Sequence, residues 1–192
     1  MHAVRFPHLA ALLLTASLLF ACGGSPEPPP LSHPLGGDFT LTDQDNAPFK
    51  LASRRGKVVL LYFGYTLCPE ACPTMLAKLV RVFHLLGPRA KDVEVVFVSV
   101  DPRRDTPATL KSYLSYFKIP VTGLTGTKEE IDRVVHQYGA FYEFTDSGSA
   151  AGPLVNHSTH LYAIDRKGEL GPLFAHDDPP DRIAAEIEKL LR

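Results

Sequence analysis

Apolar residues form two nearly continuous runs in the middle of the chain, at residues 57–65 (KVVLLYFGY) and 93–100 (VEVVFVSV). Runs of this length are typical of strands that are buried on both faces of a sheet, and such strands are usually parallel. The segment between the runs carries apolar side chains at helical spacing, namely Leu76, Leu79, Val80 and Phe83. Pro73 suits the first helical turn, and Gly87-Pro88 ends the helix. The pattern therefore predicts a strand–helix–strand unit.

Two more helices follow, and both have capping signals at their beginnings. Thr106 can cap a helix with Pro107 at its first position, and Thr127 with Glu130 forms a capping box. The first of these helices has an apolar stripe of Leu110, Tyr113, Leu114 and Phe117, and the second has one of Ile131, Val134, Val135 and Tyr138. Short extended segments at 121–124 and 140–144 complete this region.

The remaining segments predict two hairpins, an insertion and a last helix. Residues 38–51 alternate in polarity around a turn at Asp45-Asn46, and residues 159–165 and 169–176 flank a second turn. Residues 145–153 form an insertion rich in Gly, Ser and Ala. The last helix has an apolar stripe of Ile183, Ile187, Leu190 and Leu191. This order predicts an α/β fold, a thioredoxin-like three-layer sandwich with an extra N-terminal β-hairpin.

The N-terminal segment differs in composition from the rest. Residues 1–21 combine Arg5 with an apolar run too short for a stable membrane span, which indicates a signal peptide. The run ends in Leu19-Phe20-Ala21-Cys22, which resembles a bacterial lipoprotein box with Cys22 as the lipidated residue. The alternative is an ordinary signal peptide that is cut nearby, with Cys22 lost. Residues 22–35 are rich in Pro and predict an extended tether, so the folded domain is expected at 36–192.

These features predict an exported lipoprotein, anchored in a membrane and facing the periplasm or the cell exterior. The net charge is −1 and no basic run is present, so nothing indicates binding to nucleic acid. The length suits one domain, which we expect to be monomeric.

Cys68 and Cys72 are the two cysteines outside the leader, and they lie between a buried strand and the beginning of a helix. The positive end of a helix dipole favours thiolates, which bind soft metals or exchange disulfides. The loop that a Cys68–Cys72 disulfide would close is very short, so such a disulfide would add little stability. The two roles that remain for Cys68 and Cys72 are a metal site and a redox pair.

His157 is the leading candidate for a third ligand. The strand at 159–165 should run antiparallel to the strand before the cysteines, so the residues at its beginning lie at the same sheet edge. Two thiolates and an imidazole suit copper, although zinc would accept the same set, and a lone loop histidine is often a surface residue. His160 should face the opposite way, and we interpret His84, His136 and His176 as structural or solvated.

Asp101 follows the second buried strand, in VSVDPRRDTP. It either forms the turn before Pro102, or shapes the loop beneath the cysteines and tunes their ionisation.

Four segments of the chain resemble the Sco/SenC family of thioredoxin-like copper chaperones for cytochrome c oxidase assembly. They are YTLCPEACPTML, VSVDPRRDTP, the pair Phe141-Tyr142 and VNHSTHLYAID. The resemblance implies that Cys68, Cys72 and His157 bind copper, as Cu(I), Cu(II) or both. It implies delivery of copper to the dinuclear site in the copper-binding subunit of cytochrome c oxidase, and exchange with another periplasmic copper carrier or a thiol reductant. Asn156 departs from the Asp common in the family, which removes a charge beside His157.

Two enzymatic alternatives remain open. In the first, Cys68 and Cys72 form a redox-active disulfide, and the protein is a thiol–disulfide oxidoreductase that reduces the cysteines of the oxidase copper site. Three residues separate the cysteines, where thioredoxin-type enzymes have two, and the wider loop favours metal binding. The second alternative, a thiol peroxidase, would need Thr and Arg side chains close to an activated cysteine.

Overall fold

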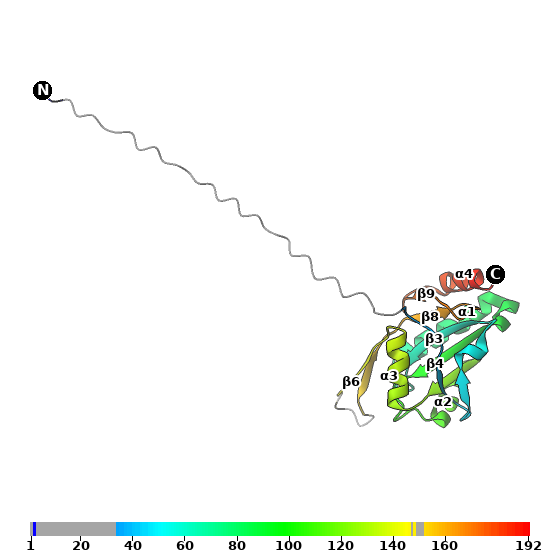
Figure 1. Ribbon diagram of the computed structural model, residues 1–192, viewed down its shortest axis with the longest axis horizontal. Helices are drawn as coiled ribbons and strands as arrows, with labels where there is room; N and C mark the ends of the chain where they lie inside the picture. Colours follow the sequence, from blue (N-terminus) through cyan, green and yellow to red (C-terminus); the bar gives the residue numbers. More distant parts are fainter. Residues whose placement is uncertain (1, 3–33, 147, 149–151) are drawn as a thin grey trace. The chain divides into compact units, whose positions relative to one another are not determined.

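A mixed β-sheet forms the centre of the protein, as seen in a computed structural model that describes residues 2, 34–146, 148 and 152–192 (Figure 1). Its strands are β1 (Thr40–Asp43), β2 (Pro48–Lys50), β3 (Val58–Gly64), β4 (Val93–Ser99), β5 (Val121–Thr125), β8 (Leu161–Ile164) and β9 (Leu170–Phe174). The order across this seven-stranded sheet is β2-β1-β5-β4-β3-β8-β9. Cys22 and nearly all of the expected signal peptide and tether lie outside the described residues.

The two apolar runs form the middle of this sheet. Strands β3 and β4 are parallel, with Tyr62 opposite Phe97, and every residue of both strands is buried. Strand β5 is parallel to β4, whereas β8 is antiparallel to β3. The buried parallel pair, the N-terminal hairpin of β1 and β2, and the antiparallel direction of β8 are therefore confirmed.

Helices cover both faces of the sheet. They are α1 (Ala71–Leu86), α2 (Pro107–Leu114), α3 (Lys128–Gln137) and α4 (Pro180–Leu190), with short 3₁₀ helices η1 (Leu51–Arg54) and η2 (Gly87–Asp92). Tyr62 and Phe63 are neighbours on β3 and point to opposite faces. The Tyr62 ring contacts Phe97, which contacts Tyr113 of α2, whereas the Phe63 ring contacts Tyr138 at the end of α3. Gly64 lies on the Tyr62 face of β3 and approaches both the Phe97 ring and Cys72 of α1, so α1 shares the face of α2. Helix α4 packs against α1, and α3 forms the third layer (Figure 1). The thioredoxin-like three-layer fold is confirmed.

The capping residues act as the sequence indicates. Thr106 accepts a hydrogen bond from the Thr109 amide, and Thr127 and Glu130 form the complete capping box. Helix α1 ends at Gly87, whose positive φ of 54° suits glycine. The buried face of α1 is wider than the predicted stripe, because Met75 and Val82 are fully buried while Val80 is only half-buried.

A second, two-stranded sheet consists of β6 (Tyr142–Thr145) and β7 (Leu154–His157). The sequence pattern predicts a strand close to β6 but none at β7. Residues 145–153 are expected to form an insertion. Strand β7 is only four residues long, and it pairs antiparallel with β6, the element that precedes it. Residues 147 and 149–151, between the two strands, lie outside the described part of the chain.

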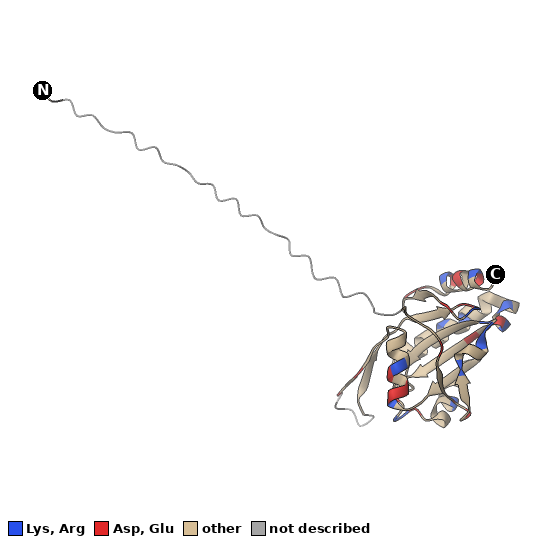
Figure 2. Ribbon diagram, in the orientation of Figure 1, with Lys and Arg blue, Asp and Glu red and all other residues tan. Residues whose placement is uncertain are grey.

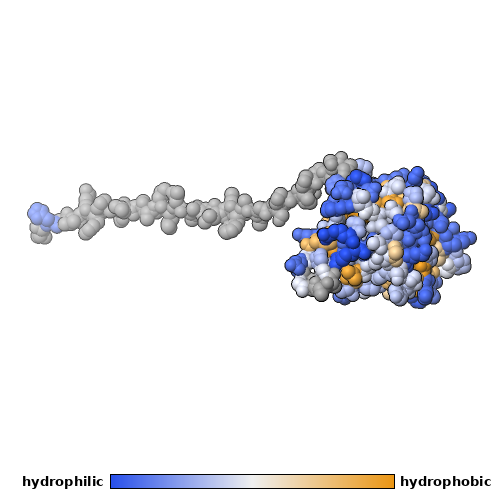
Figure 3. All heavy atoms as spheres, turned by 90° about the horizontal axis from the view of Figure 1, so that it is seen from below, coloured by the Kyte–Doolittle hydropathy of each residue, from blue (hydrophilic) through white to orange (hydrophobic). Residues whose placement is uncertain are grey.

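Charged side chains are distributed over the outer surfaces of the helices. Figure 2 shows basic and acidic residues next to one another on α3 and α4, with few on the central strands. The face seen in Figure 3 is mostly hydrophilic, with small separate hydrophobic areas. Within the described ranges, no helix combines the length and hydrophobicity needed to cross a membrane.

Candidate metal centre

The two cysteines lie where β3 ends and α1 begins. The chain leaves the sheet after Gly64, and the Cys68 amide donates a hydrogen bond to the Tyr65 carbonyl, which closes a turn. Helix α1 begins at Ala71, so Cys72 occupies its first turn and Cys68 the loop before it. The Cys72 amide donates to the Cys68 sulfur at 3.4 Å. An unpaired amide at a helix N-terminus stabilises negative charge, so this contact favours a thiolate at Cys68.

His157 brings an imidazole to the same point. Its Nε2 lies 3.7 Å from the Cys68 sulfur and 3.6 Å from the Cys72 sulfur, and the three candidate ligand atoms all lie within 4.8 Å of one another. An ion at about 2.3 Å from sulfur and about 2.0 Å from nitrogen, in a trigonal or tetrahedral site, needs sulfur–nitrogen distances of about 3.5–3.8 Å. Both sulfur–nitrogen distances therefore fit a three-ligand metal site.

The tautomer of His157 also suits metal binding. Its Nδ1 lies 2.9 Å from the Ser158 carbonyl oxygen. A carbonyl only accepts, so Nδ1 carries a proton and donates, and Nε2 is the nitrogen that remains for a metal ion. Nε2 faces the two sulfurs. A backbone contact to the remote nitrogen is a common way to fix the orientation of a ligating histidine.

Gly64 allows Cys72 to approach the sheet. A Cβ atom at this position would lie 2.6 Å from the Cys72 sulfur and 2.8 Å from the Phe97 ring. Real Cβ atoms do not come so close, so any larger residue would push α1 or the ring away. Glycine at the end of β3 therefore sets the depth of the inner thiol.

The two thiols differ in ionisation. Hydrogen bonding from the Cys72 thiol, with contributions from His157 and from the amides of Cys72 and Glu70, lowers the pKa of Cys68 to about 4 although burial opposes this. Burial raises the pKa of Cys72, and the negative charge on Cys68 raises it further. The metal-free site therefore holds one thiolate and one thiol.

Two tyrosines fix the position of the imidazole. The rings of Tyr62 and Tyr65 meet the His157 ring edge to face, with centroids 6.2 and 5.8 Å away. The Tyr65 hydroxyl also accepts a hydrogen bond from the Val155 amide at 3.2 Å. Strand β7 is thus attached to the segment that leads into the cysteines. This attachment holds the three candidate ligands in fixed positions relative to one another.

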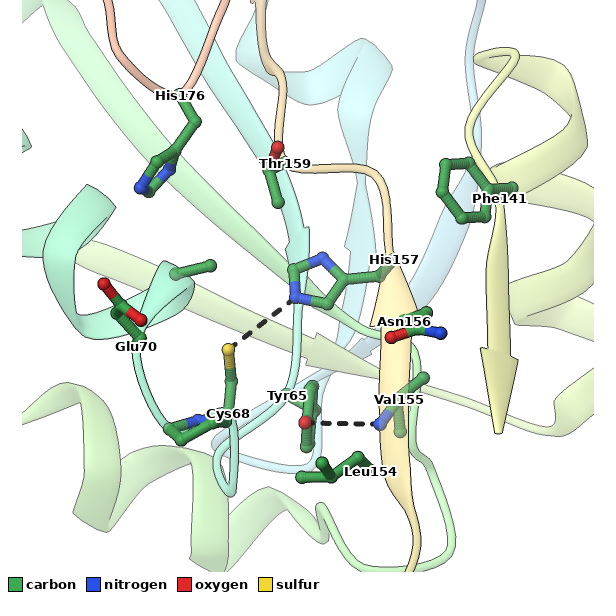
Figure 4. A pocket seen from close by; sticks show the side chains of 12 residues that line it. Tyr65, Cys68, Glu70, Phe141, Leu154, Val155, Asn156, His157, Thr159 and His176 are labelled. Atoms are coloured by element: carbon green, nitrogen blue, oxygen red, sulfur yellow. Dashed lines mark hydrogen bonds between the residues drawn. The ribbon is translucent and has the colours of Figure 1, made fainter. Parts of the chain in front are cut away.

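The site opens into a pocket of about 500 Å³ (Figure 4). Cys68 and His157 line it and are each about 9% exposed, whereas Cys72 is fully buried behind them. Three exposed apolar side chains lie in the segments that meet at the site. They are Leu67 in the loop before α1, Phe141 just before β6 and Leu154 at the start of β7. A metal ion would therefore be reached from the side of Cys68 and His157.

Asp105 shapes the loop beneath the cysteines. This role is one of the two alternatives that the sequence analysis gives for Asp101. The buried Asp105 carboxylate accepts hydrogen bonds from the Thr66 amide, the Thr66 hydroxyl and the Ser99 hydroxyl, at 3.0, 2.6 and 2.6 Å. Burial raises the pKa of Asp105. Its sequence context resembles an ordinary turn, and its partner Thr66 is 39 residues away, so no local pattern identifies it.

Asp101 forms the turn after β4. Its backbone carbonyl accepts from the amides of Arg104 and Asp105, and its buried carboxylate pairs with the Arg104 side chain. Arg104 in turn donates to the Pro153 carbonyl at 2.8 Å and lies over the Tyr65 ring. Asp101 therefore forms the expected turn, and through its ion pair with Arg104 it is also connected to Pro153, at the start of β7.

The other residues singled out in the sequence lie around this centre. His84, His136 and His160 are exposed. His176 is half-buried and lines the pocket, a position that the sequence does not indicate. The Asn156 amide donates to the Thr145 hydroxyl at 3.2 Å, so it ties β7 to β6, and the partner of His157 Nδ1 is the Ser158 carbonyl.

Comparison with known proteins gives a consistent result. The model of the SCO1/SenC family matches residues 28–192. A SCO2-like protein of Rickettsia felis is 37% identical over 151 residues, which cover 78% of this chain and 73% of that protein. The structure of copper-bound ScoI from Bradyrhizobium japonicum has a TM-score of 0.75 and 37% identity, and the match covers 82% of this chain and 100% of the other. Copper-bound ScoI from Arabidopsis thaliana has a TM-score of 0.77 and 32% identity, covering 83% and 99%. The Cys68-Cys72-His157 cluster fits a copper site of this kind.

Proposed function

The chain belongs to the SCO1/SenC family, and we propose that it binds one copper ion through Cys68, Cys72 and His157 and delivers it to the dinuclear copper site of cytochrome c oxidase. The observation that carries this proposal is the geometry of His157. Its protonated Nδ1 is held by a backbone carbonyl, while Nε2 lies within 3.7 Å of both sulfurs. Thiolates favour Cu(I) and imidazole accommodates both oxidation states, so the set suits copper in either form.

The three residues take different parts in binding. Cys68 is already a thiolate in the metal-free protein and supplies the first bond. Cys72 is a buried thiol, so copper displaces its proton, and binding releases a proton to solvent. His157 needs no reorientation, because Nε2 already faces both sulfurs while Nδ1 donates to the Ser158 carbonyl.

Release of copper uses the open side of the site. Cys72 lies behind the other two residues, and the pocket leaves room for a ligand from the acceptor to approach the ion. The acceptor ligand can then bind the copper ion before Cys68 or His157 dissociates from it. We infer that the acceptor is the copper-binding subunit of the oxidase, with a thiol reductant or a copper carrier acting upstream.

The N-terminal segment supports a location at a membrane surface. We infer that residues 1–21 direct export and that acylated Cys22 anchors the protein, with residues 22–35 as a tether. This arrangement would hold the site facing the periplasm or the cell exterior, where the copper centre of an oxidase subunit is assembled.

One observation favours a second function, reduction of the acceptor cysteines. Cys68 is a partly accessible thiolate, and Cys72 lies directly behind it. Cys68 could attack an acceptor disulfide and release one acceptor thiolate. Cys72, losing its proton, would then attack Cys68 and release the second, so that two electrons pass to the acceptor and a Cys68–Cys72 disulfide remains. This disulfide and copper binding exclude each other, because copper needs both thiolates.

An oxidase-assembly assay with two variants separates the functions. His157→Ala removes a copper ligand but leaves the dithiol, whereas Cys68→Ser removes both chemistries. Copper delivery predicts that assembly fails with both variants, while His157→Ala still reduces an acceptor disulfide. Normal assembly with His157→Ala, combined with failure of Cys68→Ser, would contradict copper delivery and support the reductase.

A further inference from the structure

His176 lies in the wall of the copper pocket, outside the three-ligand cluster. It belongs to the loop between β9 and α4 and lines the same pocket as Cys68 and His157. In Figure 4, its ring and the Glu70 side chain lie on the side of the pocket opposite Asn156 and His157. Within the described residues, the group of ligand atoms that lie within 4.8 Å of one another comprises only Cys68, Cys72 and His157. His176 is therefore near the centre but not part of it.

The backbone of His176 is attached to the helix that carries Cys72. The Lys78 ammonium of α1 donates to the His176 carbonyl, and it donates to the Asp178 carbonyl at 2.8 Å. The loop thus keeps a fixed position relative to the dithiol, and this does not depend on the imidazole. The imidazole is free to serve another purpose.

The ring of His176 has an unused polar atom. Its Nδ1 is buried and has no hydrogen-bond partner among the described residues. Such atoms are rare in folded proteins, and each calls for an explanation. An imidazole suits copper in both oxidation states, and the exposed Glu70 carboxylate on the same side favours a cation. His176 therefore offers an imidazole in the wall of the same pocket that Cys68 and His157 line.

We propose that His176 is an outer copper ligand, which holds the ion in the pocket beside the Cys68-Cys72-His157 set while the ion passes to or from that set. This inference rests on the proposed copper-binding function. At the outer position the ion would be shared by His176, Cys68 and a ligand of the donor or acceptor. The ion would then keep its ligands throughout the exchange, and its oxidation state would not change. The role is kinetic, because His176 does not belong to the final set.

The test measures both the rate and the equilibrium of copper uptake by the reduced protein from a coloured Cu(I)–bicinchoninate complex. We expect His176→Ala to slow uptake about tenfold and to leave the equilibrium competition constant within about twofold of the wild type. His176→Met replaces the imidazole with a thioether that also binds Cu(I), so it should restore most of the rate. His84→Ala, which removes an exposed histidine of α1, should change neither quantity.

Three results would overturn the proposal. They are an unchanged rate in His176→Ala, a rate that falls together with the equilibrium constant, and a His176→Met variant as slow as His176→Ala. The second would make His176 a resident ligand, and the third would make its role structural. Failure of the wild-type protein to take up any copper would instead contradict the proposed function itself, and Cys68→Ser shows the signal expected in that case.

Discussion

The hydroxyl of Tyr65 accepts a hydrogen bond from the Val155 amide at 3.2 Å, and this bond joins the segment before Cys68 to the strand that ends at His157. Cys68 lies in the loop after β3 and Cys72 in the first turn of α1, whereas His157 belongs to the separate β6–β7 sheet. A copper site assembled from two such parts depends on contacts that hold them together. Tyr65 provides one, and its ring packs against His157 as well.

The hydroxyl of Tyr65 should therefore matter for the site. Tyr65→Phe keeps the ring but leaves the Val155 amide without this acceptor, so we expect a loss of about 1 kcal/mol in the free energy of unfolding. Copper affinity should fall as well, because His157 would be less firmly placed. Urea denaturation and copper competition measure the two effects. Tyr116→Phe, at a tyrosine that is 77% exposed, is the matched control. Equal affinity in Tyr65→Phe and the wild type would show that β7 is held without this bond.

Asp105 should act through its hydrogen bonds rather than its charge. Asp105→Ala leaves the Thr66 amide and two hydroxyl groups without their acceptor, and we expect it to cost about 2–3 kcal/mol of stability. Asp105→Asn can still accept from the Thr66 amide and donate to a hydroxyl, so it should cost about 1 kcal/mol or less. Denaturation midpoints of the two variants give the comparison. If Asn were as damaging as Ala, the negative charge itself would be required.

The ionisation of the dithiol predicts selective alkylation. In the reduced, metal-free protein the pKa of Cys68 is about 4, so its thiolate is present throughout the neutral range, whereas Cys72 remains a buried thiol. Iodoacetamide at pH 6 should label Cys68 well before Cys72, as measured by peptide mass spectrometry. The rate at Cys68 should fall as the pH drops through about 4. A rate that instead rises with a midpoint close to 9, the ordinary value for a thiol, would contradict the assignment.

The same shift makes stability depend on pH. Between about pH 4 and pH 9, Cys68 is deprotonated in the folded state and protonated in the unfolded chain. The unfolded state then binds more protons, so the contribution of Cys68 to stability rises with pH in this window and is lost as pH falls toward 4. Cys68→Ser removes this contribution and should flatten the pH profile of the denaturation midpoint.

The sequence predicts the fold and the dithiol from local patterns. The runs before Cys68 and Asp101 indicate buried parallel strands, and both Thr caps lie where they are expected. The approach of His157 to the cysteines follows from the antiparallel direction of β8. Strand β7 is missed because a strand of four residues has too short an alternation to stand out. Asp105 and the position of His176 are missed because they depend on partners far away in the sequence, such as Thr66 for Asp105. Periodicity cannot identify such contacts.

The leader makes a prediction that does not depend on the site. Wild-type protein expressed with its full N-terminus should fractionate with membranes, because several acyl chains on one cysteine give stable anchoring. Cys22→Ser should be found in the soluble exported fraction, while Cys68→Ser stays with the membranes. Mass spectrometry of the N-terminal peptide checks the modification. An unmodified N-terminus on a protein that washes off membranes would rule out the lipid anchor.

The most direct test of the central claim is X-ray absorption spectroscopy of the copper-loaded, reduced protein, together with its copper stoichiometry. We predict one Cu(I) per chain, bound by two sulfur atoms at about 2.3 Å and one imidazole nitrogen at about 2.0 Å. In His157→Ala the nitrogen contribution should disappear while both sulfurs remain, and Cys72→Ser should lose tight binding altogether. An unaltered nitrogen contribution in His157→Ala, or a site with a single sulfur in the wild type, would contradict the Cys68-Cys72-His157 copper centre.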